Sequence, residues 1–365
     1  MLKRFEVKGF KNFKDTLTID FTDVRDYKFN TECITDDLIG KMIVYGKNSV
    51  GKSNLGLAVF DIVTHLSSAR YNSELYDYYL YSDGETFRAD FKYLFQFGND
   101  TIEYSYSKDT QRALVFEKIE INGKLLFSYS FLKGEGEYGT IKEIAPTLKL
   151  DGLNVPSVLR YIINNTSLNN NDPLSKMMFY VERMLWFRSI DKSHSIGYKI
   201  KGDDYYEFIR YGNNLAEFQE FLHNAGVKEN LDIKKEPDGT MALYFDTATP
   251  MPFFKVASSG TKALYTFFYW YKTAKDVSLI FIDEFDAFYH YELAESIVRL
   301  LEKMPNTQVI LTSHNTNLLT NRIMRPDCYF ILSDNRLTSF ANATNRELRE
   351  GHNLEKLYKS GEFDG

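Results

Sequence analysis

The sequence has 365 residues, 44% of them hydrophobic and 26% charged, which are the values of a globular protein with one large or two modest domains. The net charge of −6 argues against a protein whose whole surface is basic and binds nucleic acid. It is compatible with a local basic groove. Cys33 and Cys328 are too few for a disulfide framework or a zinc site, and no apolar run is long enough to span a membrane. Charged residues interrupt the apolar pattern of residues 1–7, whereas a secretory signal needs an uninterrupted apolar stretch. We therefore expect a cytoplasmic protein.

The first third of the chain predicts mainly β-structure. Residues 2–9 alternate apolar and charged side chains and predict a half-buried strand, and residues 17–21 predict a second one. Residues 22–40 are polar and predict a loop. Residues 86–130 alternate with a period of two between turn residues, which predicts an antiparallel meander. Five tyrosines before the meander could stack nucleic-acid bases, or belong to the core, which is the commoner case: Tyr71, Tyr76, Tyr78, Tyr79 and Tyr81.

A glycine-containing motif precedes this meander. Residues 46–53, GKNSVGKS, fit the pattern G-x-x-x-x-G-K-[ST], between an apolar run at 42–45 and a helical pattern that ends near Leu66. The glycines let backbone N–H groups face a phosphate, and the helix N-terminus adds partial positive charge there. We expect Lys52 to reach the β- and γ-phosphates and the Ser53 hydroxyl to hold Mg²⁺. The predicted nucleotide-binding residues are Gly46, Lys47, Asn48, Ser49, Val50, Gly51, Lys52 and Ser53.

The middle of the chain alternates between helical and extended patterns. Residues 155–188 predict helix with interruptions, residues 204–224 predict a second helical stretch, and residues 231–254 predict strands. No long coiled coil fits between Ser53 and Ser258. A helix then begins after residue 256, where Ser258 or Ser259 can cap it and Gly260 exposes its first amides, which predicts a second anion-binding helix N-terminus.

Two apolar strands with polar ends follow. Residues 277–284 predict a strand buried on both faces, as in a parallel sheet, and it ends in Asp283 and Glu284. Acids at the carboxyl end of such a strand lie where open α/β sheets bind ligands, so Asp283 suits the Mg²⁺ shell and Glu284 the base that polarises the attacking water.

A histidine marks the end of the next strand. Residues 307–312 predict another buried strand, and His314 follows it. A lone histidine at a strand end is usually structural, but the position of His314 after the acidic strand favours a hydrogen bond to the γ-phosphate. We interpret His290, at the start of a helix, as structural.

The segments GKNSVGKS, ASSGTK, LIFIDEFDAFYH and LTSHNTNLL together resemble the ABC-type ATPases related to RecF, SMC and OLD proteins. The resemblance implies an α/β fold, an ABC-ATPase head with a mixed central sheet, an antiparallel β-meander and an inserted helical subdomain, with ATP and Mg²⁺ as cofactors. In those terms residues 46–53 form Walker A and Asp283-Glu284 end Walker B. The remaining implied roles are the signature at Ser258, Ser259, Gly260 and Thr261, the D-loop Asp286 and the switch histidine His314.

The glutamine loop of that family has no secure counterpart. Gln96 is a candidate metal contact, but its alternating strand supports an ordinary structural interpretation equally well. The family also implies a homodimer or larger homo-oligomer, in which the signature of one subunit closes over the ATP of the other. We expect an N-terminal lobe at 1–150, a helical insertion and partner platform at 151–230, a C-terminal lobe at 231–345 and a tail at 346–365.

The C-terminal part narrows the resemblance to the ATPases of bacterial anti-phage operons, such as abortive-infection ATPases and the ATPase of the PARIS system. It rests on residues 315–319, 324–330 and 358–365. It implies a sensor or scaffold that holds a separate nuclease, of the TOPRIM class, or a toxin, until DNA or a phage protein triggers it. Two alternatives stay open: a RecF-like DNA-maintenance ATPase, and a nucleotide-gated binding module with little turnover.

Overall fold

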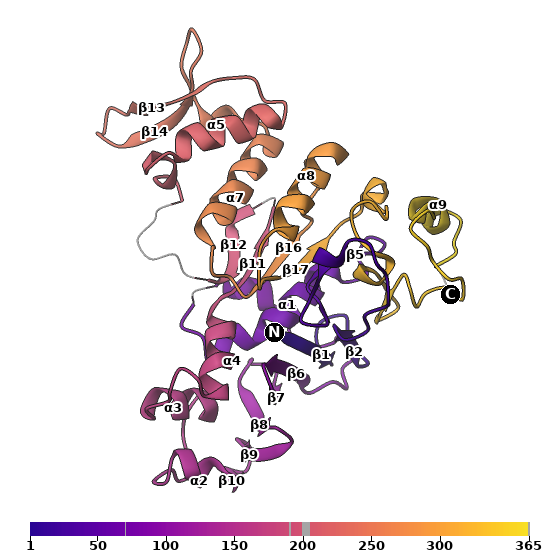
Figure 1. Ribbon diagram of the computed structural model, residues 1–365. Helices are drawn as coiled ribbons and strands as arrows, with labels where there is room; N and C mark the ends of the chain where they lie inside the picture. The colour runs from indigo at the N-terminus through magenta and orange to yellow at the C-terminus, as the bar shows by residue number, and fades with distance from the viewer. Residues whose placement is uncertain (70, 190, 199–204, 364–365) are drawn as a thin grey trace.

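The computed structural model describes residues 1–69, 71–189, 191–198 and 205–363. Two seven-stranded sheets form the body of the molecule, and helix α1 (Lys52–Leu66) lies between them (Figure 1). A small subdomain around α5 (Asn214–Asn224), β13 (Leu231–Lys235) and β14 (Met241–Phe245) projects at one end, and the antiparallel sheet forms the other end. No helix in these ranges has the length and apolar character needed to cross a membrane.

The central sheet has the strand order β12-β11-β16-β17-β5-β18-β19. Its five inner strands are parallel, whereas β12 and β19 pair antiparallel at the two edges, so the sheet is mixed as predicted. Every residue of β5, β16 and β17 is buried, which is why these strands read as continuous apolar runs. The strands are β5 (Lys41–Tyr45), β11 (Met184–Arg188), β12 (Asp191–Gly197), β16 (Leu279–Asp283), β17 (Gln308–Thr312), β18 (Tyr329–Ser333) and β19 (Arg336–Ser339).

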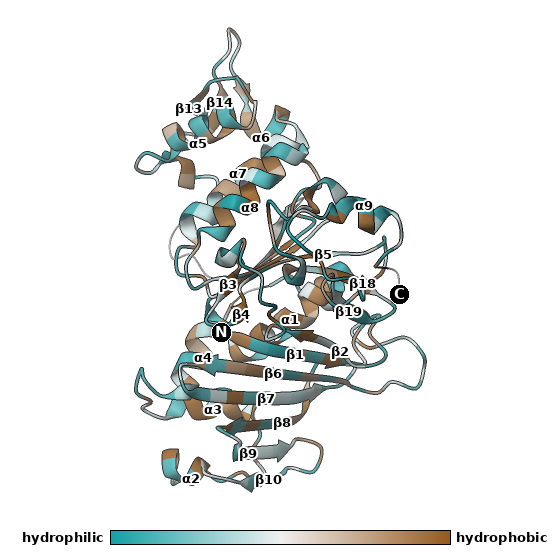
Figure 2. Cartoon of the chain, turned by 45° about the vertical axis from the view of Figure 1, so that its right-hand side comes forward, coloured by the Kyte–Doolittle hydropathy of each residue, from teal (hydrophilic) through white to brown (hydrophobic). Residues whose placement is uncertain are grey.

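The second sheet is entirely antiparallel and contains the predicted meander. The side chains of its inner face pack towards α1, whereas its outer face carries charged and small polar side chains. Figure 2 shows its strands side by side, with hydrophilic and hydrophobic residues along them. The strands, in spatial order, are β10 (Glu135–Tyr138), β9 (Lys124–Ser130), β8 (Leu114–Ile121), β7 (Asp100–Lys108), β6 (Ala89–Phe97), β1 (Leu2–Lys8) and β2 (Leu17–Asp20).

Helix α1 packs closely against the central sheet. A Cβ atom on Gly56 would lie 2.6 Å from the indole nitrogen of Trp186 and 2.7 Å from the Phe281 ring, so only glycine fits there. On the opposite face of the sheet lie α7 (Ser259–Thr273) and α8 (Tyr291–Glu302), with Trp270 of α7 stacked 5.9 Å from Phe187 of β11. The sheet is therefore covered on both faces.

A buried polar cluster joins α1 to the antiparallel sheet. Asp61, on α1, accepts hydrogen bonds from the hydroxyls of Tyr79 and Tyr106 at 2.8 and 2.9 Å, and pairs with the Lys108 ammonium at 2.6 Å. Because Asp61 and Lys108 are each at least 98% buried, all their polar atoms depend on partners inside the protein. The core interpretation is thus confirmed for Tyr76 and Tyr79, while Tyr78 is 95% exposed.

The remaining elements surround these two sheets. Short pieces are β3 (Ile34–Thr35) and β4 (Leu38–Ile39), which pair with each other, and β15 (Met251–Pro252), which extends the β13–β14 pair. The remaining helices are α2 (Ile141–Ile144), α3 (Val158–Asn165), α4 (Pro173–Glu182), α6 (Phe253–Val256) and α9 (Leu354–Lys359), with 3-10 helices at Thr31–Cys33, Ser73–Tyr76, Phe208–Arg210, Thr316–Leu318 and Pro326–Cys328.

Several predicted segments differ from the structure. The helical prediction for 155–188 is wrong at its end, because residues 184–188 form β11, whose partner β16 lies far away in the sequence. Residues 22–40 are not all loop, since they contain the β3–β4 hairpin. In the predicted helix at 204–224 only α5 and a 3-10 turn are helical, and Asp204 lies outside the described residues, as do residues 364–365 of the tail.

Candidate nucleotide-binding site

The phosphate-binding loop connects β5 to α1 and leaves the start of the helix open. Gly51, the N-cap of α1, has φ +104° and Ser49 has φ +65°, both in the left-handed region. The N-cap residue places no side chain on the first amides, and the helical bonds begin with Leu55 N–H donating to the Gly51 carbonyl. The N–H groups of the first turn can therefore donate hydrogen bonds to an anion. The positive end of the helix dipole also favours a negative charge at this point.

Asn12 braces this loop from the turn that follows β1. Its side-chain amide donates to the Val50 carbonyl at 3.0 Å, and its carbonyl oxygen accepts from the Asn54 amide at 2.8 Å. A Cβ on Gly51 would lie 2.2 Å from the Asn12 amide nitrogen, so the brace and the glycine depend on each other. The sequence alone does not predict this role of Asn12, because its partners Val50 and Asn54 lie about 40 residues away in the chain.

Lys52 lies beside the acidic pair at the end of β16. Its ammonium donates to the carbonyls of Gly46 and Lys47 at 2.9 and 3.1 Å and is largely buried. Burial lowers the pKa of Lys52, and the nearby Asp283 and Glu284 carboxylates act in the opposite direction. The structure thus brings the loop lysine and the two predicted acids together.

Thr312 and Arg188 hold the Asp283 carboxylate. The Thr312 hydroxyl donates to one carboxylate oxygen at 2.9 Å, and the Arg188 Nε–H donates to the other at 3.1 Å. The Thr312 oxygen also accepts from the backbone N–H of Glu284 at 2.7 Å, and Glu284 has φ +51°, a position that costs a non-glycine residue free energy. Arg188 was missed because residues 184–188 fell inside a predicted helix.

Asp286 and His314 complete the neighbourhood. The Ser313 hydroxyl donates to Asp286 at 2.6 Å, and burial raises the pKa of Asp286 to about 6, against the lowering effect of that hydrogen bond. His314 is exposed. Partial burial and the nearby Lys52 lower the pKa of His314, while Glu284 and Asp283 act to raise it. His314 therefore belongs to the same charged neighbourhood as Lys52 and the acidic pair.

The predicted signature residues form the N-terminus of α7. Ser258 is the N-cap, and its oxygen accepts from the Thr261 N–H at 3.1 Å and bonds the Thr261 hydroxyl at 2.9 Å. A Cβ on Gly260 would lie 3.0 Å from the Phe288 carbonyl, so this helix start packs against the segment that follows Asp286. Among the described residues, no hydrogen bond joins residues 258–261 to residues 46–53 of the same chain.

Residues 41–320 match the protein family described as "AAA domain, putative AbiEii toxin, Type IV TA system". The chain belongs to this family. No curated protein matches the chain. Solved structures similar to it include an SMC head bound to the C-terminal winged-helix domain of ScpA, at 16% identity and a TM-score of 0.47, covering 93% of this chain and 97% of that one. The SMC head domain from Thermotoga maritima, at 16% identity and a TM-score of 0.42, covers 93% and 98%, and that of Pyrococcus furiosus bound to ScpA, at 12% and 0.46, covers 99% and 98%.

Gln96 of this AAA-domain protein does not join the site. Its side-chain amide donates to the Gly98 carbonyl at 2.6 Å, and its backbone pairs with Met1, at the start of β1. Asn12, which touches the phosphate-binding loop, follows the other end of β1. The strand therefore separates Gln96 from Ser53 and Asp283, and the structural interpretation of Gln96 as a strand residue is the one observed.

The residues present fit a nucleoside triphosphate with Mg²⁺. The uncapped start of α1 and the Lys52 ammonium, whose partners within the described part of the chain are two loop carbonyls, suit phosphate oxygens. The Ser53 hydroxyl and the Asp283 carboxylate supply the oxygen ligands that Mg²⁺ prefers. Bound Mg²⁺ would neutralise charge that develops on the phosphates.

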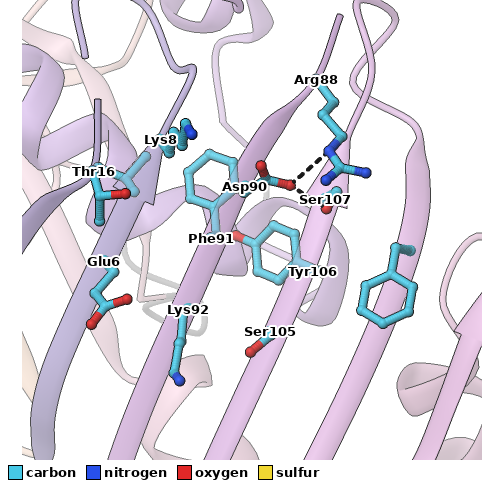
Figure 3. Close-up of a pocket in the computed structure, with 12 residues that line it drawn as sticks. Glu6, Lys8, Thr16, Arg88, Asp90, Phe91, Lys92, Ser105, Tyr106 and Ser107 are labelled. Carbon is cyan, nitrogen blue, oxygen red and sulfur yellow. Dashed lines mark hydrogen bonds and ion pairs between the residues drawn. The ribbon is translucent and has the colours of Figure 1, made fainter. Parts of the chain in front are cut away.

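A separate hollow of about 450 Å³ lies on the outer face of the antiparallel sheet (Figure 3). Within it, Arg88 pairs with Asp90 at 3.1 Å, and the Ser107 hydroxyl donates to Asp90 at 2.5 Å. Lys92, also in the hollow, pairs with Glu103 at 2.9 Å. None of the predicted nucleotide-binding residues lines this hollow, so it is separate from the predicted site.

Proposed function

We propose that this AAA-domain protein binds ATP with Mg²⁺ at residues 46–53 and hydrolyses it. The observation that supports this most is the meeting of Lys52, the acidic pair and His314 beside an uncapped helix N-terminus. Phosphoryl transfer demands little covalent chemistry from a protein, so positioning and charge stabilisation supply most of the catalysis.

Each side chain then has a distinct role in hydrolysis. Lys52 would move from the loop carbonyls to the β- and γ-phosphates, and Ser53 and Asp283 would hold Mg²⁺. Glu284 accepts a proton from the attacking water, and its partly exposed position leaves room for that water. His314 donates a hydrogen bond to the γ-phosphate from its exposed ring.

Substitution at two positions tests binding and hydrolysis separately. Lys52→Ala removes the cation that faces the phosphates, so calorimetry should detect no ATP binding. Glu284→Gln keeps the shape of the side chain but removes the base, so binding should persist while hydrolysis falls by roughly 100-fold or more. Unchanged ATP affinity in Lys52→Ala would refute the assignment of the loop, and wild-type turnover in Glu284→Gln would move the base elsewhere, with Asp286 the next residue to test.

The ATP site is proposed to form between two copies of the chain. The N-terminus of α7 has no hydrogen bond to its own phosphate-binding loop within the described part of the chain, and the side chains of Val256 and Phe288 beside it are 49% and 38% exposed. In a homodimer, residues 258–261 and Asp286 of one subunit would close over ATP held by the other.

Complementation tests the shared site. Gly260→Arg blocks close approach of α7 to a phosphate but leaves residues 46–53 intact, whereas Lys52→Ala does the reverse. Their mixture should recover part of the wild-type hydrolysis that neither variant shows alone, once subunit exchange is demonstrated by labelled protein. A monomeric mass of Glu284→Gln in saturating ATP would refute the shared site.

In the cell we propose a sensor and scaffold subunit of an anti-phage complex. The family description, with its AbiEii toxin and type IV toxin–antitoxin system, supports a role in bacterial conflict. The protein would hold a separate TOPRIM-class nuclease, or a toxin, until DNA or a phage protein triggers release, with residues 151–230 as the platform. Co-expression with the neighbouring genes should protect cells from phage, and Lys52→Ala should abolish protection. Full protection by Lys52→Ala would refute an ATP-dependent role.

One observation favours a second function, a nucleotide-gated binding module with little turnover. Arg188 and Thr312 each bond one Asp283 oxygen, and the Arg188 guanidinium competes with Mg²⁺ for the negative charge of this carboxylate. Full biological activity of Glu284→Gln would favour this second function.

A further inference from the structure

A pocket of about 900 Å³ lies at the edge of the central sheet opposite the nucleotide site. Its walls are α4 on one side and, on the other, residues 275–278 and 305–306, which lead into β16 and β17. Because these parallel strands carry Asp283 and His314 at their carboxyl ends, the pocket at their amino ends is separate from the phosphate-binding loop. Its volume is in the range of pockets that hold small organic ligands.

An arginine that stacks on an aromatic ring lines this pocket. The guanidinium carbon of Arg183 lies 3.5 Å from the centre of the Phe179 ring, and Phe179 is 56% exposed. The Arg183 Nε–H is buried without a hydrogen-bond partner, and across the described ranges no ion pair or hydrogen bond involves this side chain. Arg183 is only partly buried and lines the pocket, so its terminal N–H groups remain available to an anion there.

The pocket is also cationic, in a chain whose net charge is −6. Lys176 and Lys275 line it with Arg183, and Asp276 is the one acid among its lining residues. Lys176, Phe179 and Arg183 recur at the spacing of one helix face on and just after α4, so they present their side chains together. Lys176 has a single weak ion pair, with Asp100 at 3.8 Å.

The walls of the pocket are already fixed by hydrogen bonds. The Ser278 N–H donates to the Arg183 carbonyl at 3.0 Å, and the Ser278 hydroxyl donates to the Tyr180 carbonyl at 2.5 Å. The Tyr180 hydroxyl donates to Gln308 at 2.6 Å, which ties α4 to the start of β17. The stack of Arg183 on Phe179 therefore stands on a rigid frame, as a preorganised binding site requires.

We infer that this pocket binds a small organic anion that carries a planar ring, of the class of purine nucleoside monophosphates. The ring stacks on the Arg183–Phe179 pair, because guanidinium and aromatic planes both accept a flat conjugated partner. The phosphate pairs with the free Arg183 N–H groups and with Lys275. The inference does not depend on ATP binding at residues 46–53.

Calorimetry on the full-length Lys52→Ala protein tests the pocket without binding at the phosphate-binding loop. Adenosine 5′-monophosphate should bind more tightly than adenosine, which lacks the anion, and than inorganic phosphate, which lacks the ring. Adding Arg183→Gln should weaken the binding of the monophosphate about tenfold or more, as expected when a charge-assisted hydrogen bond is lost. Adding Arg349→Gln, at an exposed arginine outside the pocket, should leave the affinity unchanged.

Two further measurements keep the outcome decisive. Phe179→Leu should weaken the binding of the monophosphate and leave the binding of inorganic phosphate unchanged, because the substitution removes the aromatic ring but no charge. Thermal melting of each variant without ligand confirms that the fold survives. Equal affinity for the monophosphate in the Arg183→Gln and Arg349→Gln proteins would overturn the inference, and so would a monophosphate that binds no better than adenosine or inorganic phosphate. If the wild-type protein binds no ATP, the proposed function is refuted, but the inference about this pocket is not.

Discussion

Replacement of Asp286 by asparagine should make the protein more stable at alkaline pH. The Asp286 side chain is 8% exposed, and burial raises its pKa from the ordinary 3.8 to about 6. Asparagine keeps an oxygen that accepts the hydrogen bond from Ser313 but carries no charge to bury. The substitution therefore isolates the free-energy cost of the buried carboxylate.

The sign of this effect follows from proton linkage. The folded state binds the Asp286 proton more tightly than the unfolded state, so stability is lost as pH rises from 3.8 through about 6. At about 1.36 kcal/mol per pH unit, the full cost is about 3 kcal/mol above pH 6. Between pH 4.5 and pH 8 about 2 kcal/mol of this cost develops in the wild-type protein and none in Asp286→Asn.

Urea unfolding of both proteins at these two pH values measures the difference directly. The free energy of unfolding of Asp286→Asn minus that of wild type should be about 2 kcal/mol larger at pH 8 than at pH 4.5. Ser313→Ala removes the hydrogen bond that lowers the pKa of Asp286. The stability of this variant should therefore continue to fall to a higher pH than that of the wild-type protein. A relative stability that is the same at both pH values would refute the reasoning.

Three further substitutions probe the supports of the site. Asn12→Ala removes both hydrogen bonds to the loop, so ATP affinity by calorimetry should fall about tenfold, and an unchanged affinity would deny the brace any role. Gly51→Ala places a Cβ against Asn12 at a left-handed φ and should lower the free energy of unfolding by about 2 kcal/mol in urea titration; a loss below about 0.5 kcal/mol would show that the loop relaxes. Arg188→Gln leaves Asp283 without its cation and should cost about 2 kcal/mol in Mg²⁺-free buffer, with a smaller loss when Mg²⁺ and ATP are present; equal losses would separate Asp283 from the metal.

The parts of the site that sequence predicts are those encoded within one segment. Residues 42–66 contain the strand, the loop and the helix together, so their apolar pattern and glycines were sufficient to predict β5, the phosphate-binding loop and α1. The same holds for β16 with Asp283 and for the cap of α7 by Ser258, since each signal is local.

The parts that sequence misses depend on partners distant in the chain. Arg188 reaches Asp283 only because β11 adds to the edge of β16, and a short apolar run such as residues 184–188 does not reveal its strand partner. Asn12 is a turn residue until the fold places Val50 against it. For Gln96 the alternating pattern predicts which face of the strand the residue lies on. It does not predict which end of the sheet the residue occupies, so the distance from the site was not predictable.

The position of α1 between the two sheets couples ligand occupancy to the integrity of the whole molecule. Gly56 fits α1 to the central sheet, and Asp61 ties it to Lys108 of the antiparallel sheet, so neither sheet can separate without disturbing the helix whose first turn is the proposed nucleotide site. By mass action, a ligand at about 1,000 times its dissociation constant adds about 4 kcal/mol to the stability of everything that must be folded to bind it. A destabilising substitution far from the site, for example at Lys108, should therefore have little effect on the folded fraction in cells with abundant nucleotide. It should lower the folded fraction when starvation depletes the nucleotide.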